Sequence, residues 1–173
     1  TANDIAIILS ASGSTPYALA SAENARSKGA KIIAIANNAN APLFDHADVA
    51  ICLRTPPEVV AGSTRLGAGT AQKVALNVMS SLMGVQLGHV YQGMMVNVVA
   101  DNAKLVQRAT AIVCQIAGVS EGTAVAALNA AKGGVKPAIL IAKGHSPNDA
   151  DTLLARHKGH LGPCLQAEFH ETN

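Results

Sequence analysis

Aromatic residues and charged residues are both scarce in this sequence of 173 residues. It has no tryptophan, only two tyrosines and two phenylalanines, and Asp, Glu, Lys and Arg together make up 14%. Binding of nucleic acid usually needs a basic surface or aromatic rings on which bases stack, and a net charge of +2 with so few rings provides neither. We therefore do not expect nucleic acid to be a partner.

Cysteine is also scarce, and the three cysteines form no motif. Cys52, Cys114 and Cys164 lie far apart and are odd in number, so the sequence indicates neither a disulfide framework nor a zinc site. Reduced cysteines of this kind are typical of the cytoplasm, where we expect the protein to be. The histidines match no standard spacing of metal ligands, and we expect no metal and no cofactor.

Apolar runs long enough for a membrane span are missing as well, so we expect no membrane partner. Apolar residues nevertheless make up 49%, which argues against disorder and predicts extensive burial, including a subunit interface. The length fits one domain with a small appendage. Because Thr1 leads almost at once into a strand-like run, we expect further sequence before it.

Three short apolar runs rich in β-branched residues predict strands at 5–9, 31–36 and 48–53. Between the first two, residues 16–28 have the composition of a short helix that closes on a lysine and a glycine. Strands that alternate with helices predict an α/β fold with a parallel sheet. We expect the first strand to be buried, and we expect other strands or another chain to cover the edges and the face that three strands leave open.

The turn after the first strand carries four hydroxyls, on Ser10, Ser12, Ser14 and Thr15. Pro16 follows, and proline is favoured at the first position of a helix, which makes Thr15 the expected N-cap. The amides at such a helix start are unpaired and carry partial positive charge, so with these hydroxyls they suit a phosphate or another small anion. The alternative is a serine-rich turn whose hydroxyls satisfy only the backbone around them.

A second polar cluster, residues 55–65, follows the third strand. Two prolines favour an extended approach, and Gly62-Ser63-Thr64 are then expected to cap a long helix over residues 65–87. This helix is apolar around most of its circumference, which places it at the centre of the molecule or at a dimer interface. Glu58 and Arg65 belong to the cluster, and the alternative is that they are a solvated carboxylate and a surface cation.

The rest of the chain has helical patterns. After a connector that the pattern assigns neither to strand nor to helix, apolar residues recur at helical spacing from Asp101, and Gly118 ends that helix. The sequence therefore predicts an α/β domain over residues 1–100 and a linking helix with a small helical bundle over residues 101–173. Three shorter helices are expected in the bundle, each closing on a lysine and a glycine, at 132–133, 143–144 and 158–159.

Residues 10–15, Ser-Ala-Ser-Gly-Ser-Thr, resemble the phosphate-binding Ser-x-Ser-Gly-x-Thr loop of the sugar isomerase (SIS) domain. Within that superfamily, the run from Pro56 to Lys73, with its Pro-Glu and Gly-Ser-Thr-Arg steps, resembles the signature that N-acetylmuramic acid 6-phosphate etherases share with glucokinase regulatory protein. Tyr91 and the short C-terminal helices extend the resemblance over nearly the whole chain. The sequence departs from the signature at Pro56, where the family has a glycine, and at Gly67, where it has a lysine.

This resemblance implies a three-layer SIS sandwich that is incomplete at its N-terminus, a phosphorylated amino sugar as ligand, and a homodimer with its site near the interface. The family cleaves the lactyl ether of N-acetylmuramic acid 6-phosphate, giving N-acetylglucosamine 6-phosphate and D-lactate in cell-wall recycling. Its two proposed acid–base glutamates precede the matched loop, so we expect them before Thr1. The alternatives are a non-catalytic phosphosugar sensor and a phosphosugar isomerase. The resemblance implies that Ser10, Ser12 and Thr15 contact the phosphate and that Ser63 and Thr64 contact the sugar or the phosphate. It implies a contact with the sugar ring for Glu58.

Overall fold

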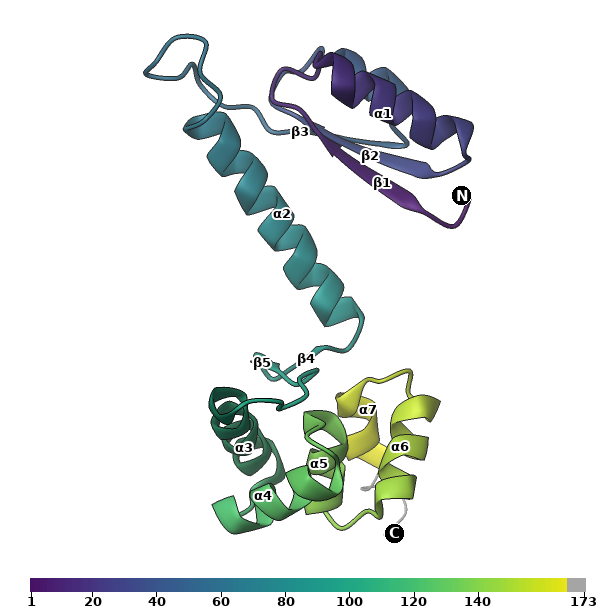
Figure 1. Cartoon of the computed structure of the whole chain (residues 1–173), viewed down its shortest axis with the longest axis vertical. Helices are drawn as coiled ribbons and strands as arrows, with labels where there is room; N and C mark the ends of the chain where they lie inside the picture. Colours follow the sequence, from purple (N-terminus) through teal and green to yellow (C-terminus); the bar gives the residue numbers. More distant parts are fainter. Residues whose placement is uncertain (168–173) are drawn as a thin grey trace. The chain divides into compact units, whose positions relative to one another are not determined.

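The computed structural model describes residues 1–167, and Figure 1 labels its α-helices and strands. The chain packs as two compact units, one comprising Thr1–Met79 and the other the residues from Ser80 onward. The sequence pattern places the end of the α/β domain at residue 100 instead, and that boundary stays a prediction. In chain order the elements are β1 (Ile5–Leu9), α1 (Pro16–Ser27), β2 (Lys31–Ala36), η1 (Pro42–His46), β3 (Val49–Cys52), α2 (Gly67–Gln86), β4 (Val90–Tyr91), β5 (Met94–Met95), α3 (Ala103–Ala117), α4 (Glu121–Ala130), α5 (Val135–Ala142), α6 (Pro147–Arg156) and α7 (Leu161–Ala167).

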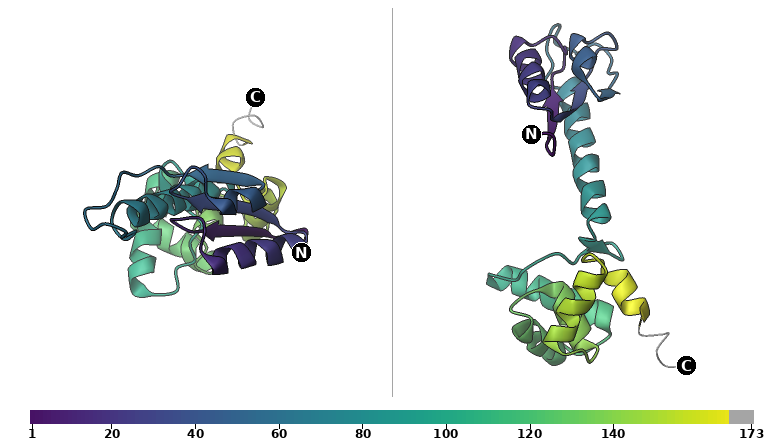
Figure 2. Two further views of the ribbon diagram at one scale, coloured as in Figure 1. Left: turned by 90° about the horizontal axis from the view of Figure 1, so that it is seen from above. Right: turned by 90° about the vertical axis from the view of Figure 1, so that its right-hand side faces the viewer.

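The sheet of the first unit is parallel, which confirms the predicted α/β topology. Its order is β1-β2-β3, so β2 is the central strand, and Ile33 lies opposite Ile7 on one side and Val49 on the other. The helix α1 and the short helix η1 lie against one face of this sheet (Figures 1 and 2). The core between them is small and contains Ala22, Ile32 and Leu43, which are fully buried.

The opposite face of the sheet is buried at Ile35 but open at the beginning of β1, and one expectation fails there. The sequence predicts a buried first strand, which is wrong for Ile5 and Ile7, since their side chains are 64% and 40% exposed. Side chains alternate along a strand, so Ile8 packs toward the core under α1 while its neighbours point to the other face. An apolar run predicts that a strand needs cover on both faces, but it does not say which part of the protein supplies the cover.

The carboxylate of Asp48 binds a backbone amide at the start of β2. The Asp48 carboxylate accepts a hydrogen bond from the Ile32 amide at 2.8 Å and another from the Lys31 ammonium at 2.9 Å. The Asp48 amide in turn donates to the Ile32 carbonyl at 2.9 Å. The bond from the Ile32 amide, helped by the one from Lys31, lowers the pKa of Asp48 below its ordinary value. These bonds hold the beginnings of β2 and β3 together.

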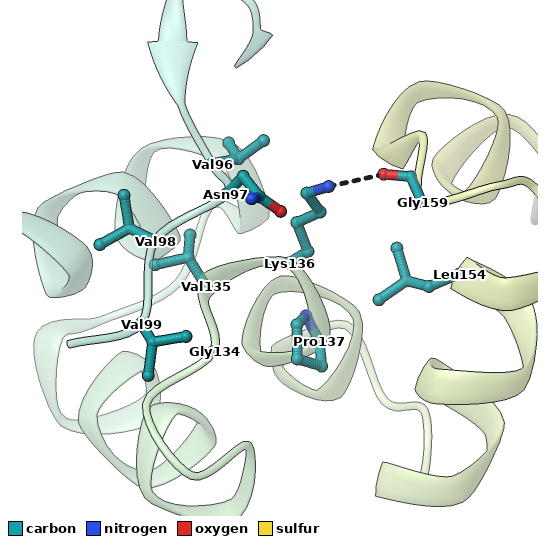
Figure 3. A pocket seen from close by; sticks show the side chains of 10 residues that line it. All are labelled: Val96, Asn97, Val98, Val99, Gly134, Val135, Lys136, Pro137, Leu154 and Gly159. Carbon is teal, nitrogen blue, oxygen red and sulfur yellow. Dashed lines mark hydrogen bonds between the residues drawn. The ribbon is translucent and has the colours of Figure 1, made fainter. Parts of the chain in front are cut away.

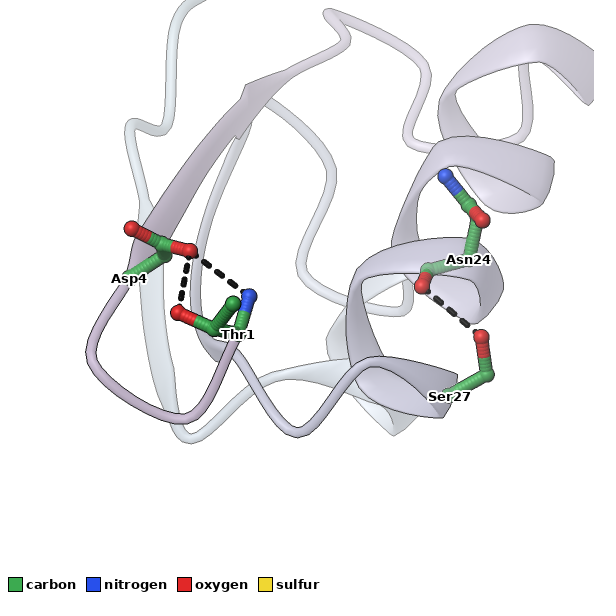
Figure 4. Close-up of polar contacts among 4 residues, drawn as sticks. All are labelled: Thr1, Asp4, Asn24 and Ser27. Atoms are coloured by element: carbon green, nitrogen blue, oxygen red, sulfur yellow. Dashed lines mark hydrogen bonds and ion pairs between the residues drawn. The ribbon is translucent and has the colours of Figure 1, made fainter.

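Two local polar contacts lie away from the Ser10 turn, one just before β1 and the other in the last turn of α1 (Figure 4). Asp4 accepts hydrogen bonds from the amino group and the hydroxyl of Thr1, at 2.6 and 2.7 Å. The Ser27 hydroxyl donates to the Asn24 carbonyl at 2.9 Å, within α1. Ser27 is therefore a surface hydroxyl with a purely local partner, which makes it a useful control for the serines discussed below.

The second unit is a helical bundle, as predicted, with α3 to α6 at the expected places. The asparagine and serine side chains before three of these helices cap them, because Asn102, Ser120 and Ser146 each accept a backbone N–H three residues on. The helix α7 was not predicted. The connector before α3 forms the short antiparallel hairpin β4-β5. Within residues 1–167, no helix taken singly has both the length and the hydropathy of a membrane span, although the bent pair α3 and α4 meets that test when joined.

Candidate functional site

The turn after β1 gathers three hydroxyls around Ser10. Its hydroxyl oxygen lies 2.9 Å from the Thr15 hydroxyl and 3.5 Å from the Ser12 hydroxyl, and it accepts a hydrogen bond from the Gly13 amide at 3.0 Å. Ser10 is buried, whereas Ser12 and Thr15 are exposed. Ser10 thus holds the turn in shape through its hydrogen bonds, and the Ser12 and Thr15 side chains are open to solvent.

Thr15 stands at the predicted N-cap position, but its hydroxyl does not cap α1. The helix begins at Pro16 with no hydrogen bond from its first turn to the Thr15 side chain, because that hydroxyl is engaged with Ser10. The first-turn amides of α1 therefore remain for another acceptor, which is the arrangement that favours anion binding. The alternative interpretation also holds in part, since Ser12 accepts the Ser14 amide at 3.2 Å.

The second polar cluster is organised by Glu58. Its carboxylate accepts the amides of Leu66 and Ala68, each at 3.1 Å, and so caps the start of α2 from eight and ten residues upstream. The predicted cap at Gly62-Ser63-Thr64 is wrong, and α2 begins at Gly67 rather than at residue 65. The Ser63 hydroxyl accepts only the Arg65 amide, at 3.2 Å, in the loop before the helix. Glu58 is half-buried and engaged, so it is not a freely solvated carboxylate.

The two clusters line one cavity of about 480 Å³ in the first unit. We name it the Ser12 cavity, and its lining includes Ser12, Glu58, Ser63 and Thr64. Ser10 and Thr15 are not part of the lining, but the Ser10 hydroxyl lies 3.5 Å from that of Ser12 and 2.9 Å from that of Thr15. The structure therefore brings four of the six predicted residues to one cavity, and the other two are connected to it through Ser12.

Two asparagines that were not predicted as site residues also line the Ser12 cavity. Asn37 donates to the Leu53 carbonyl at 2.8 Å and accepts from the Gln72 amide group of α2 at 2.9 Å. Asn38 donates to the Ser12 carbonyl at 3.2 Å. They follow β2, and a polar run just after a strand of a parallel sheet is the signal that could have identified them, because ligands bind at the carboxyl ends of such strands.

Metal ligands do not gather in the described part of the chain. Across residues 1–167, no group of three or more His, Cys, Asp or Glu side chains is placed to hold a metal ion. The Ser12 cavity instead offers hydroxyls, two amide side chains and one carboxylate that is already engaged. Such a lining suits a polar, hydroxyl-bearing ligand with an anionic group.

Comparison with known proteins identifies the family to which this region is similar. The SIS domain family matches residues 1–81. These residues are a SIS domain. The match includes every residue that lines the Ser12 cavity, so the whole candidate site belongs to the SIS domain. The predicted fold class, a parallel-sheet SIS domain followed by a helical bundle, is confirmed.

The similarity of the chain to known proteins extends beyond the SIS domain. It is 42% identical over 166 residues to N-acetylmuramic acid 6-phosphate etherase 1 of Enterococcus faecalis, which covers 95% of this chain and 55% of the relative. It is 44% identical over 164 residues to N-acetylmuramic acid 6-phosphate etherase of Deinococcus radiodurans (94% and 54%) and 45% identical over 166 residues to that of Yersinia pestis (95% and 56%). The chain thus spans about half the length of the curated relatives it matches, and the predicted etherase resemblance is confirmed.

Proposed function

We propose that this chain is the phosphosugar-binding part of an etherase that cleaves N-acetylmuramic acid 6-phosphate to N-acetylglucosamine 6-phosphate and D-lactate. The observation that carries the proposal is that Ser12 of one cluster and Ser63 and Thr64 of the other line a single cavity. Ser10, Ser12 and Thr15 with the start of α1 would hold the phosphate, while Ser63 and Thr64 would contact the sugar. The relatives named as etherases of this substrate support the assignment.

The chemistry proposed for the whole enzyme is an elimination followed by addition of water. A base removes the proton beside the aldehyde of the opened sugar, the ether oxygen leaves with the lactate, and water adds to the resulting double bond. The reaction needs a positioned base and an acid for the leaving oxygen. Glu58 is poorly suited to either role, since a proton placed on either carboxylate oxygen would disturb a bond to the Leu66 or the Ala68 amide. We therefore assign the acid–base carboxylates to sequence outside this chain, and Glu58 to the sugar side of the cavity.

The decisive experiment measures lactate release from N-acetylmuramic acid 6-phosphate by the full-length cytoplasmic protein. We expect release by the full-length protein and none by this chain alone. Phosphosugar binding by the full-length protein without lactate release would indicate a sensor instead, and conversion between aldose and ketose phosphates would indicate an isomerase. A failure to bind any phosphosugar would overturn the proposal for the Ser12 cavity itself.

Ser12→Ala tests the phosphate assignment in this chain. We expect its affinity for N-acetylglucosamine 6-phosphate to fall by about tenfold to a hundredfold, because a hydroxyl that donates to a charged phosphate contributes more than an ordinary hydrogen bond. Calorimetric titration measures the change. Ser27→Ala is the matched control, since it removes a hydroxyl whose partner is the Asn24 carbonyl. Equal affinities for the two variants would count against a phosphate at Ser12.

The homodimer is the second part of the proposal, and α2 supports it. Val74, Val78, Leu82 and Val85 recur at helical spacing and are 53%, 51%, 58% and 52% exposed. A stripe of this length on one helix favours cover by a second copy of the protein. In sedimentation experiments we expect Leu82→Glu to shift the protein toward the monomer. Ser80→Glu adds the same charge to the opposite side of α2 and should leave the dimer intact; a monomeric parent protein would refute this part.

A further inference from the structure

The second unit contains a cavity of about 350 Å³ whose wall holds a buried lysine (Figure 3). The cavity lies between the extended segment 96–99, the beginning of α5, and the residues Leu154 and Gly159. Its remaining lining is mostly apolar, and Figure 3 shows Lys136 and Pro137 between Val99 on one side and Leu154 on the other. We name it the Lys136 cavity.

Lys136 is only 8% exposed, which is unusual for a lysine without an acidic partner. Its ammonium donates to the Gly159 carbonyl at 2.8 Å, and an ammonium has two further N–H groups. Neither of the ion pairs found within residues 1–167 includes Lys136. Burial lowers the pKa of Lys136 below its ordinary value, because the charged form of the ammonium is less stable in this buried position than in water.

The other titratable group close to Lys136 offers no negative charge. The Cys164 thiol is fully buried, and its single S–H has the carbonyls of His160 and Leu153 within reach as acceptors, at 3.2 and 3.6 Å. Burial raises the pKa of Cys164, so the thiol stays neutral beside the lysine. The local charge is therefore positive, and an external anion is the group that would complete it.

We propose that the Lys136 cavity binds a small monocarboxylate with a short apolar chain, whose carboxylate pairs with Lys136 and whose chain lies against Val99, Pro137 and Leu154. The volume is at the lower end of the range for small-molecule sites, which fits a ligand of this size. A sugar is disfavoured because the apolar wall leaves its hydroxyls without partners. A phosphate is disfavoured because one ammonium with the amide of Asn97 gives few donors for a dianion.

Butyrate and its uncharged isostere butyramide test this proposal on the whole chain. We expect butyrate to bind with a dissociation constant of about a millimolar and to shift the backbone NMR signals of residues 134–137. Butyramide should bind at least tenfold more weakly, because it lacks the charge that pairs with Lys136. Butyrate binding should also fade as the pH rises through the lowered pKa of Lys136, at a pH where ordinary lysines are still charged. Inorganic phosphate should cause no saturable shift of these signals.

Two variants separate the charge from the shape of the Lys136 cavity. Lys136→Met keeps the length of the side chain and should abolish butyrate binding, while Val99→Phe should abolish it by filling the apolar side. Val99 is 64% exposed, so the second variant tests the proposal even if the first does not fold. Equal binding of butyrate and butyramide, unchanged binding by either folded variant, or no binding of butyrate to the parent chain would overturn the proposal. Lys136 would then serve only to bind a carbonyl that follows α6.

Discussion

Gly13→Ala is expected to lower the free energy of unfolding of the first unit by about 2–5 kcal/mol. Gly13 has a φ of +70°, which a side chain disfavours, and a Cβ at this position would overlap the Cβ of Ala41. The segments that contain Gly13 and Ala41 cannot easily move apart, because the Gly13 carbonyl accepts a hydrogen bond from the Leu43 amide at 3.0 Å. Urea unfolding monitored by hydrogen exchange of the β2 amides measures the loss of stability in the first unit.

Gly29→Ala is the matched control for Gly13→Ala. Gly29 has a similar φ of +78°, but the nearest atom to its Cβ would be 3.6 Å away, in Ala2. This variant therefore carries only the backbone penalty of about 1–2 kcal/mol. If both variants lose the same stability, the close approach of the turn to Ala41 contributes nothing. If Gly13→Ala loses more, as we expect, the turn owes its shape to the absence of a side chain, and phosphosugar affinity should fall with it.

The elements of the SIS domain could be predicted because their signals are local. The run Ile5–Leu9 is apolar and ends in hydroxyls, and Pro16 and Gly29 mark the two ends of α1. The same holds for α4, α5 and α6 of the second unit, which end where a lysine and a glycine occur together, and for α3, which ends at Gly118. For α7 the sequence gives weaker signals, since Gly162 and Pro163 occupy its first turn and both are poor helix formers in general.

The polar partners at the site could not be predicted, because they are set by contacts between distant residues. The pair of Asn37 and Gln72 joins residues 35 positions apart, and no sequence pattern predicts that the two side chains meet. Thr15 has the sequence position of a cap, yet its hydroxyl bonds to Ser10, five residues away, because the turn folds back on itself. Sequence identifies which residues surround a ligand site more readily than which of them hold one another.

Glu58→Ala is expected to weaken the binding of N-acetylglucosamine 6-phosphate by about a hundredfold, the largest effect on affinity that we expect outside the phosphate loop. The variant leaves the amides of Leu66 and Ala68 without their acceptor, so the first turn of α2 should fray. The loop that carries Ser63 and Thr64 would then lose its fixed position at the Ser12 cavity. Calorimetry measures the affinity, and hydrogen exchange at Leu66 and Ala68 measures the fraying.

Glu58→Gln separates a positioning role from direct contact with the sugar. Glutamine keeps one carbonyl oxygen of the same reach, so one of the two amides, at Leu66 or Ala68, can retain its acceptor. If Glu58 acts by holding the loop, affinity and amide protection should fall together, with glutamine intermediate between the parent and alanine in both measurements. If Glu58 instead binds the sugar directly, Glu58→Gln should lose as much affinity as Glu58→Ala while one of the two amides, at Leu66 or Ala68, stays protected. Because the carboxylate already serves two amides, we expect affinity to follow the protection of the helix start.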